Sequence, residues 1–270
     1  MINSFSVLAT KECMKELSVL CFSIRQHYDI PIFIVCDKAT KEYITLENFT
    51  NIYFRVSVDD KKLRNSKSRV EDVKKSNTFH SAEKILLKMD CVEWAAHAAG
   101  NTLFVDADIV ISKPIHEDVI DSYEVMVSPH FHPDNHHQQT KKYGAFNAGY
   151  LYTSNSLLAE VWRDIYLNRS TFYEQQGMIH FFEYFHVGTF DVTHNYGYWR
   201  FSKEWINQNI QLRDSSGMLE KAKSYHFHTD PKTFQHADTG LRKGYSALYN
   251  KILPNLNHDL VGHIRKNRCN

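Results

Sequence analysis

Residues 103–108 constrain the fold more than any other part of this 270-residue chain. Leu103, Phe104 and Val105 form a short apolar run, which predicts a strand buried on both faces, as in parallel sheets. Asp106 and Asp108 follow directly, and alternate side chains of an extended segment lie on the same side. Because such sheets bind ligands at the carboxyl ends of their strands, the two carboxylates indicate a divalent metal site. The alternative is a turn with a helix-capping aspartate.

The rest of the chain alternates between strand and helix patterns, which predicts an α/β fold. Apolar runs typical of buried strands lie at 5–9, 30–36, 52–58, 103–105, 123–129, 145–153 and 225–229. Helical spacing of apolar residues predicts helices at 11–28, 78–97, 157–166 and 174–185. The charged residues 59–77 predict a loop or a surface helix. We therefore expect one domain over 1–270, in which a parallel sheet flanked by helices begins with a nucleotide-binding half at 1–110.

Composition argues against several other classes of protein. The formal net charge of +1 gives no reason to expect nucleic acid as a partner. The five cysteines include no Cys-x-x-Cys pair, so they fit reduced thiols better than disulfides or a zinc site. Neither a signal peptide nor an apolar run of membrane-spanning length is evident. These features predict a cytoplasmic protein that could at most attach peripherally to a membrane.

Four separated motifs occur in the order that one group of enzymes shows. They are Phe104-Val-Asp-Ala-Asp108, Phe146-Asn-Ala-Gly149, Glu174-Gln175 and Tyr225-His226-Phe227. Together they resemble the Asp-x-Asp nucleotide-sugar glycosyltransferases of GT-A fold, in particular the family of glycogenin and the bacterial lipo-oligosaccharide galactosyltransferases. The resemblance implies a Rossmann-like, mixed and mostly parallel sheet, with a metal and acceptor half at 111–240 and a helical tail at 241–270. It also implies transfer of a hexose from a nucleotide sugar, expected to be a UDP-sugar, to a glycan or other hydroxyl acceptor.

The resemblance further implies a site for Mn²⁺ or Mg²⁺. Asp108 would be the principal ligand, and Asp106 would bind the metal or the ribose hydroxyls. His226 would supply the nitrogen ligand, with His228 as a rival because alternate residues of a strand share a face. A cation held there would neutralise the negative charge that develops on a departing pyrophosphate.

Donor contacts are implied for a larger set of residues. By resemblance these are Ala9, Thr10, Asp37, Lys84, Asp106, Ala107, Asn147, Ala148, Gly149 and Lys232. Ala9, Thr10 and Asp37 would lie near the base and ribose, Lys84 near the phosphate or sugar, and the segment of Asn147 and Gly149 near the sugar. Lys232 would partly replace a pyrophosphate-contacting run of the family. Each has a plain structural alternative, such as an exposed helix lysine for Lys84 or a turn residue for Asn147.

Glu174 and Gln175 would lie near the anomeric carbon as catalytic residues. A carboxylate there can hold sugar hydroxyls or stabilise oxocarbenium character, and the resemblance implies that the anomeric configuration is retained. The family usually carries aspartate where this chain has Glu174. The structural alternative is the first turn of a helix, where the helix dipole favours glutamate.

Other classes of function fit parts of the same pattern. A phosphohydrolase of the haloacid dehalogenase type also places Asp-x-Asp after a buried strand, and would use Asp106 as its nucleophile. A sugar-nucleotide pyrophosphorylase would share the fold, but it would carry a glycine-rich loop that is absent after Ala9. A non-catalytic protein that binds sugar nucleotides or carbohydrates is the remaining alternative.

Overall fold

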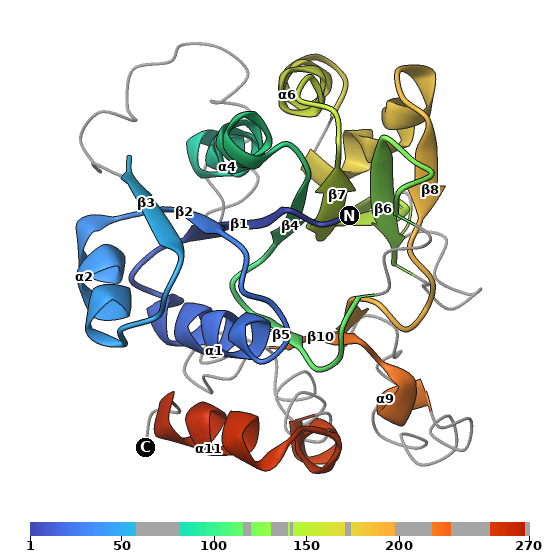
Figure 1. Cartoon of the computed structure of the whole chain (residues 1–270). Helices are drawn as coiled ribbons and strands as arrows, with labels where there is room; N and C mark the ends of the chain where they lie inside the picture. Colours follow the sequence, from blue (N-terminus) through green and yellow to red (C-terminus); the bar gives the residue numbers. More distant parts are fainter. Residues whose placement is uncertain are drawn as a thin grey trace.

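A seven-stranded sheet with the strand order β3-β2-β1-β4-β7-β6-β8 forms the centre of the molecule (Figure 1). The computed structural model describes residues 1–57, 82–115, 120–130, 140, 143–170, 174–197, 218–227 and 249–267, without the side chains of 82–84 and 218. The strands of this sheet are β1 (Ser4–Ala9), β2 (Ile32–Cys36), β3 (Ile52–Val56), β4 (Thr102–Val105), β6 (Val125–Pro129), β7 (Phe146–Thr153) and β8 (Val187–Thr189).

The sheet is mixed but mostly parallel. β1 pairs in parallel with β2 and β4, as do β2 with β3 and β6 with β8. Only β7 runs against its neighbours, β4 on one side and β6 on the other. The predicted fold class, a mixed and mostly parallel sheet flanked by helices, is therefore confirmed.

Helices cover both faces of the sheet (Figure 1). On one side lie α1 (Met14–Arg25), α2 (Lys38–Leu46) and α11 (His258–Asn267), with α11 packed on α1. On the other side lie α4 (Ala82–Ala99), α6 (Leu158–Asn168) and the 3-10 helix η2 (Glu174–Glu183). Two short helical elements are α9 (Met218–Lys221) and η6 (Leu253–Asn255).

The core beneath α6 helps to position a candidate catalytic residue. Trp162 is fully buried and meets the rings of Phe104 and Phe181 edge to face, with centroids 6.5 and 6.1 Å apart. Its indole N–H also donates a hydrogen bond to the backbone oxygen of Glu174 at 3.3 Å. Burial of the aromatic cluster therefore holds the first turn of η2 against the sheet, and Glu174 with it.

A second sheet of three strands lies beside the first, in the order β5-β10-β9. Its strands are β5 (Ile109–Ile111), β9 (Tyr196–Gly197) and β10 (Ser224–His226). β10 runs antiparallel to β5 and pairs His226 with Ile109. Because β5 follows β4 after only a short turn, this pairing places His226 beside the residues that end β4.

Several predicted elements differ from the observed ones in detail. The predicted helix at 174–185 is of 3-10 type, and the predicted strand at 52–58 ends at Val56. Helix α2 was not predicted, because only Thr40 and Ile44 of its residues are buried and no apolar stripe marks it. Residues 59–77 lie outside the described part. Among the described helices, none combines the length and the apolar character needed to cross a membrane.

Candidate active site

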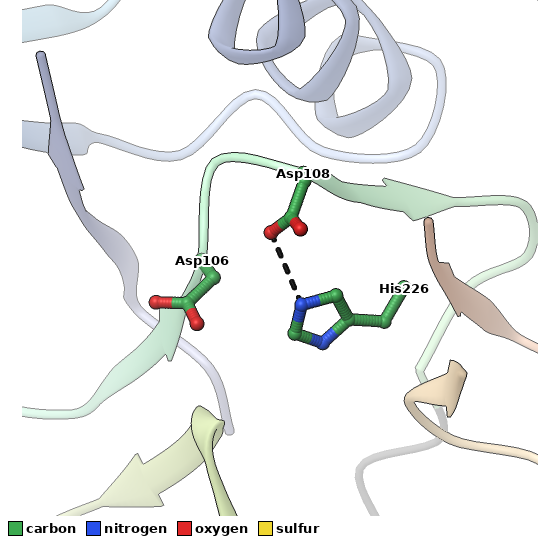
Figure 2. Close-up of side chains that lie close together, drawn as sticks. All are labelled: Asp106, Asp108 and His226. Atoms are coloured by element: carbon green, nitrogen blue, oxygen red, sulfur yellow. Dashed lines mark ion pairs between the residues drawn. The ribbon is translucent and has the colours of Figure 1, made fainter. Parts of the chain in front are cut away.

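Three side chains suited to holding a metal ion converge beyond the carboxyl end of β4 (Figure 2). Asp106 follows β4, Asp108 precedes β5, and His226 ends β10. One ligand atom from each residue lies within 4.8 Å of the others, and Asp108 Oδ1 is 3.1 Å from His226 Nε2. All three side chains are partly or largely buried, with exposed fractions of 25%, 13% and 9%. Two carboxylates and one imidazole form a donor set suited to Mn²⁺, which accepts oxygen and nitrogen ligands.

Backbone pairing explains why these residues meet. The N–H of Asp106 donates to the carbonyl oxygen of Gly149 on β7 at 2.9 Å. The N–H of Phe227 donates to the carbonyl oxygen of Asp108 at 3.0 Å, immediately after the pairing of His226 with Ile109. The site thus lies where the two sheets are joined, and each ligand is anchored by a neighbouring strand.

Gly149 lies in direct contact with the first carboxylate. A β-carbon at this position would lie 2.8 Å from Cγ of Asp106 and 2.9 Å from Oδ1 of Asn147. These separations are shorter than ordinary van der Waals contact, so any larger residue would displace Asp106 or Asn147. Glycine therefore allows both side chains to approach the backbone of β7 closely.

Lys88 on α4 links the candidate metal site to the candidate catalytic carboxylate. Its Nζ lies 2.9 Å from Oδ1 of Asp106 and 3.1 Å from Oε1 of Glu174. Burial alone lowers the pKa of Lys88, but the two neighbouring carboxylates outweigh burial and raise that pKa above its ordinary value. Lys88 is therefore a fixed positive charge that holds Asp106 and Glu174 on the same side of the site.

Cys13 lies at the end of the loop that follows β1. Burial raises the pKa of its thiol to about 12, with smaller contributions in the same direction from Glu16 and Asp108. The thiol is therefore protonated near neutral pH in the metal-free protein.

Comparison with known proteins was informative only at the level of structure. No protein-family model matches the sequence, and no curated protein matches it. Among solved structures, mouse xyloside xylosyltransferase 1 matches with a TM-score of 0.52 and 12% identity over 83% of this chain and 96% of that one. The galactosyltransferase LgtC, solved with donor and acceptor sugar analogues, matches with a TM-score of 0.53 and 12% identity over 96% and 99% of the two chains.

A third match is the glycosyltransferase GlyE of Streptococcus pneumoniae TIGR4, with a TM-score of 0.53 and 11% identity over 98% of this chain and 63% of that one. The chain has the GT-A fold. At these identities the similarity shows the fold alone. The roles of the side chains therefore have to be argued from the site itself.

The structure brings most of the predicted site residues to the same end of the GT-A sheet. Ala9 ends β1 and Thr10 follows it, while Asn147, Ala148 and Gly149 lie on β7 beside Asp106. The amide N–H of Ala148 donates to Oε1 of Gln175 at 3.5 Å. The side chain of Lys84, together with His228 and Lys232, lies outside the described residues.

Sequence reasoning missed Lys88 and Asn195. Lys88 had a detectable signal, because it lies three residues after Ile85 and four before Val92, on the buried stripe of α4. A charged residue on such a stripe needs a partner. Asn195 is fully buried and accepts a hydrogen bond from His226, but nothing in its local sequence distinguishes it from a turn residue.

Asp37 has a structural role that can be tested separately from its predicted contact with the base. Its Oδ1 accepts from the N–H of Thr40 at 2.8 Å and caps α2, while Oδ2 accepts from the N–H of Lys11 at 2.7 Å. We expect Asp37→Ala to lower the free energy of unfolding by about 1–2 kcal/mol in urea denaturation. Asp37→Asn keeps the cap but loses the bond from Lys11, because an amide NH₂ group cannot accept, so it should lose about half as much stability. Weaker donor binding by folded Asp37→Asn would indicate the base contact.

Proposed function

We propose that the protein is a divalent-metal-dependent glycosyltransferase that transfers a hexose from a nucleotide sugar to a glycan or other hydroxyl acceptor. The expected donor is a UDP-sugar. The observation that carries the proposal is the convergence of Asp106, Asp108 and His226 at the carboxyl edge of the GT-A sheet. A site with this location and this donor set is what the activation of a sugar diphosphate requires.

The donor set fits Mn²⁺ or Mg²⁺. Two hard carboxylates and one imidazole leave coordination positions open for phosphate oxygens and water. When bound, a divalent cation would neutralise the negative charge that develops on the leaving diphosphate. In this proposal Asp108 and His226 are metal ligands, while Asp106 either binds the metal or accepts from the ribose hydroxyls.

Lys88 is a second basic residue proposed to face the donor, in addition to Lys84, for which the sequence predicts the same function. Its charge is fixed by two carboxylates, and it lies between the candidate metal site and Glu174. From that position its ammonium group would donate to the donor phosphate or sugar. The remaining donor contacts are assigned as the resemblance implies, with Ala9, Thr10 and Asp37 at the nucleoside and Asn147 to Gly149, including Ala148, at the sugar. Ala107 and Lys232 complete the proposed donor contacts.

Glu174 and Gln175 are the proposed catalytic residues. The carboxylate of Glu174 is largely buried and ion-paired with Lys88, so it would face the donor as an anion. An anionic carboxylate there would hold sugar hydroxyls and stabilise positive charge on the anomeric carbon. Gln175 already contacts the backbone of Ala148 and would complete the sugar pocket. We expect the transfer to retain the anomeric configuration, within one catalytic domain over 1–270.

The test is calorimetric titration with a panel of UDP- and GDP-sugars, with Mn²⁺ and with a chelator. We expect one nucleotide sugar to bind in the presence of Mn²⁺ and to lose nearly all affinity when the metal is removed, because the diphosphate then faces Asp106 and Asp108 without a cation. Release of nucleotide from the bound donor on addition of hydroxyl acceptors would demonstrate turnover. Failure of every nucleotide sugar to bind with metal present would refute the proposal.

The alternative functions have distinct outcomes in the same experiments. A phosphohydrolase acting through Asp106 would release phosphate and form a trapped phosphoaspartate. Two observations do not favour that class. The strand β7 is antiparallel between β4 and β6, and the carboxylates come after the fourth of the described strands. Donor binding without nucleotide release in the presence of any acceptor would favour a non-catalytic binding protein.

A further inference from the structure

A chain of hydrogen-bonded side chains runs behind the candidate metal site. It joins His130, Asn147, Asn195 and His226, which come from four separate segments and are all less than 9% exposed. His130 Nε2 lies 3.4 Å from Asn147 Nδ2, and Asn147 Oδ1 lies 3.2 Å from Asn195 Nδ2. Asn195 Oδ1 in turn lies 2.9 Å from His226 Nδ1. Buried polar groups in such a chain must satisfy one another, so each orientation constrains the next.

Two backbone groups fix the orientation of Asn147. The carbonyl oxygen of Gly144 lies 3.0 Å from His130 Nδ1 and can only accept, so Nδ1 donates and Nε2 accepts from the Asn147 amide. The N–H of Gly149 can only donate, and it donates to Asn147 Oδ1 at 2.9 Å. Both constraints require the same orientation, in which the oxygen of Asn147 faces Asn195.

The orientation of Asn147 determines that of Asn195, and Asn195 determines the tautomer of His226. The NH₂ group of Asn195 donates to Asn147 Oδ1 and to Ser128 Oγ, the latter at 3.0 Å. Its oxygen therefore faces His226 and accepts a proton from Nδ1. With the proton on Nδ1, the Nε2 lone pair of a neutral His226 faces Asp108 and is available to a metal ion.

The backbone of Asn195 supports this assignment. Its φ of 51° lies in the left-handed region, which asparagine adopts more readily than most residues with a side chain. The N–H of Asn195 donates to Ser224 Oγ at 2.7 Å, which ties this conformation to β10. The backbone conformation and this hydrogen bond together fix the position from which the carboxamide of Asn195 reaches His226.

We propose that Asn195 is a positioning residue that holds His226 in the tautomer able to bind a metal and connects that histidine to Asn147 on the donor side. The proposal rests on the proposed function in so far as His226 is a metal ligand. It adds that one carboxamide, that of Asn195, connects metal binding with donor binding. Its oxygen accepts from the metal ligand His226, and its NH₂ group donates to Asn147 on the donor side.

The first test measures Mn²⁺ affinity without any nucleotide sugar, by electron paramagnetic resonance. Asn195→Gly removes the carboxamide but accepts a positive φ without strain. We expect its Mn²⁺ affinity to fall by about 10- to 100-fold, as when other hydrogen-bond partners of metal ligands are removed. Asn51→Gly is the matched control, because Asn51 also has a left-handed φ of 52° but bonds to Asp29 at the surface. It should bind Mn²⁺ like the wild type.

Asn195→Asp separates positioning from a general structural effect. Its carboxylate still accepts from His226 Nδ1, so Mn²⁺ affinity should stay near that of the wild type. It no longer donates to Asn147 Oδ1, so donor affinity at saturating Mn²⁺ should fall by about 2- to 10-fold, the value of one hydrogen bond. Equal losses of Mn²⁺ affinity in Asn195→Gly and Asn195→Asp would overturn the proposal, as would no loss in Asn195→Gly.

The second test needs no metal and no donor. Nitrogen-15 NMR of histidine-labelled, metal-free protein should show a slowly exchanging Nδ1–H signal that is missing in His226→Gln. We expect this signal to disappear in Asn195→Gly and to remain in Asn51→Gly. A wild type that binds no Mn²⁺ would contradict Mn²⁺ as the metal of the proposed function, yet this measurement would still show whether Asn195 keeps a proton on Nδ1 of His226. Persistence of the signal in Asn195→Gly would overturn the positioning role.

Discussion

Asp108→Asn is expected to abolish Mn²⁺-dependent donor binding and to lower transfer activity by more than about 100-fold. Loss of a side chain that hydrogen-bonds to a metal ligand typically lowers metal affinity or activity 10- to 100-fold, and loss of a charged ligand should lower them more. Asparagine has nearly the same shape as aspartate, so the backbone bond from Phe227 to residue 108 can persist. The predicted loss therefore reflects the missing charge. Calorimetric titration of Mn²⁺, and then of the donor at fixed Mn²⁺, measures it.

A matched substitution controls for the change in overall charge. Asp259 lies in the first turn of α11 with its side chain 79% exposed, so Asp259→Asn removes one negative charge from an exposed residue that is not one of the three candidate ligands. It should leave Mn²⁺ and donor binding unchanged. Mn²⁺ binding by Asp108→Asn at wild-type affinity would contradict the assignment of Asp108, whatever the activity of that variant.

The part of the site that could be predicted depends on local sequence. A buried apolar strand followed by alternating carboxylates occupies six consecutive residues, 103–108, and needs no tertiary information to be read. His226 was found differently, through a motif resemblance, because its approach to Asp108 depends on β10 pairing with β5 far away in the chain. The structure brings these side chains together, but their role as metal ligands stays a prediction.

The direction of β7 could not be read from the sequence. An apolar run buried on both faces has the same composition whether its strand is parallel or antiparallel, and all eight residues of β7 are buried. The antiparallel direction matters for function, because it brings the start of β7, with Asn147 and Gly149, beside Asp106. In the sequence, the family resemblance was the one indication that the Asn147 segment lies near Asp106.

Lys88 and Asn195 show why supporting residues were harder to find. Asn195 contacts Asn147 across 48 positions of sequence, and its importance follows only from the orientations of its neighbours. Lys88 has one local signal, its place on the buried stripe of α4, but its partners Asp106 and Glu174 are identified only when α4 is placed on the sheet. For such residues the sequence can indicate that a partner is needed, but it cannot say which residue the partner is.

Lys88→Met is expected to lower the free energy of unfolding by about 3–5 kcal/mol in metal-free protein, as measured by urea denaturation. Methionine preserves the length of the side chain and its packing near Phe104, whose ring centroid lies 5.7 Å from Lys88 Nζ. What is lost is the positive charge between Asp106 and Glu174, which leaves two partly buried carboxylates facing the same space. Lys88→Arg keeps the positive charge, so its free energy of unfolding should fall much less.

Two further measurements distinguish charge repulsion from lost packing as the cause of the lower stability of Lys88→Met. Adding Glu174→Gln to Lys88→Met removes one of the two carboxylates and should restore part of the stability, so the two substitutions should not be additive. Mn²⁺ should stabilise Lys88→Met more than it stabilises the wild type, because the cation then neutralises an Asp106 that Lys88 no longer holds. If neither change restores stability, the loss came from packing in α4. In that case Lys88 would not be the charge that holds the metal site and Glu174 together.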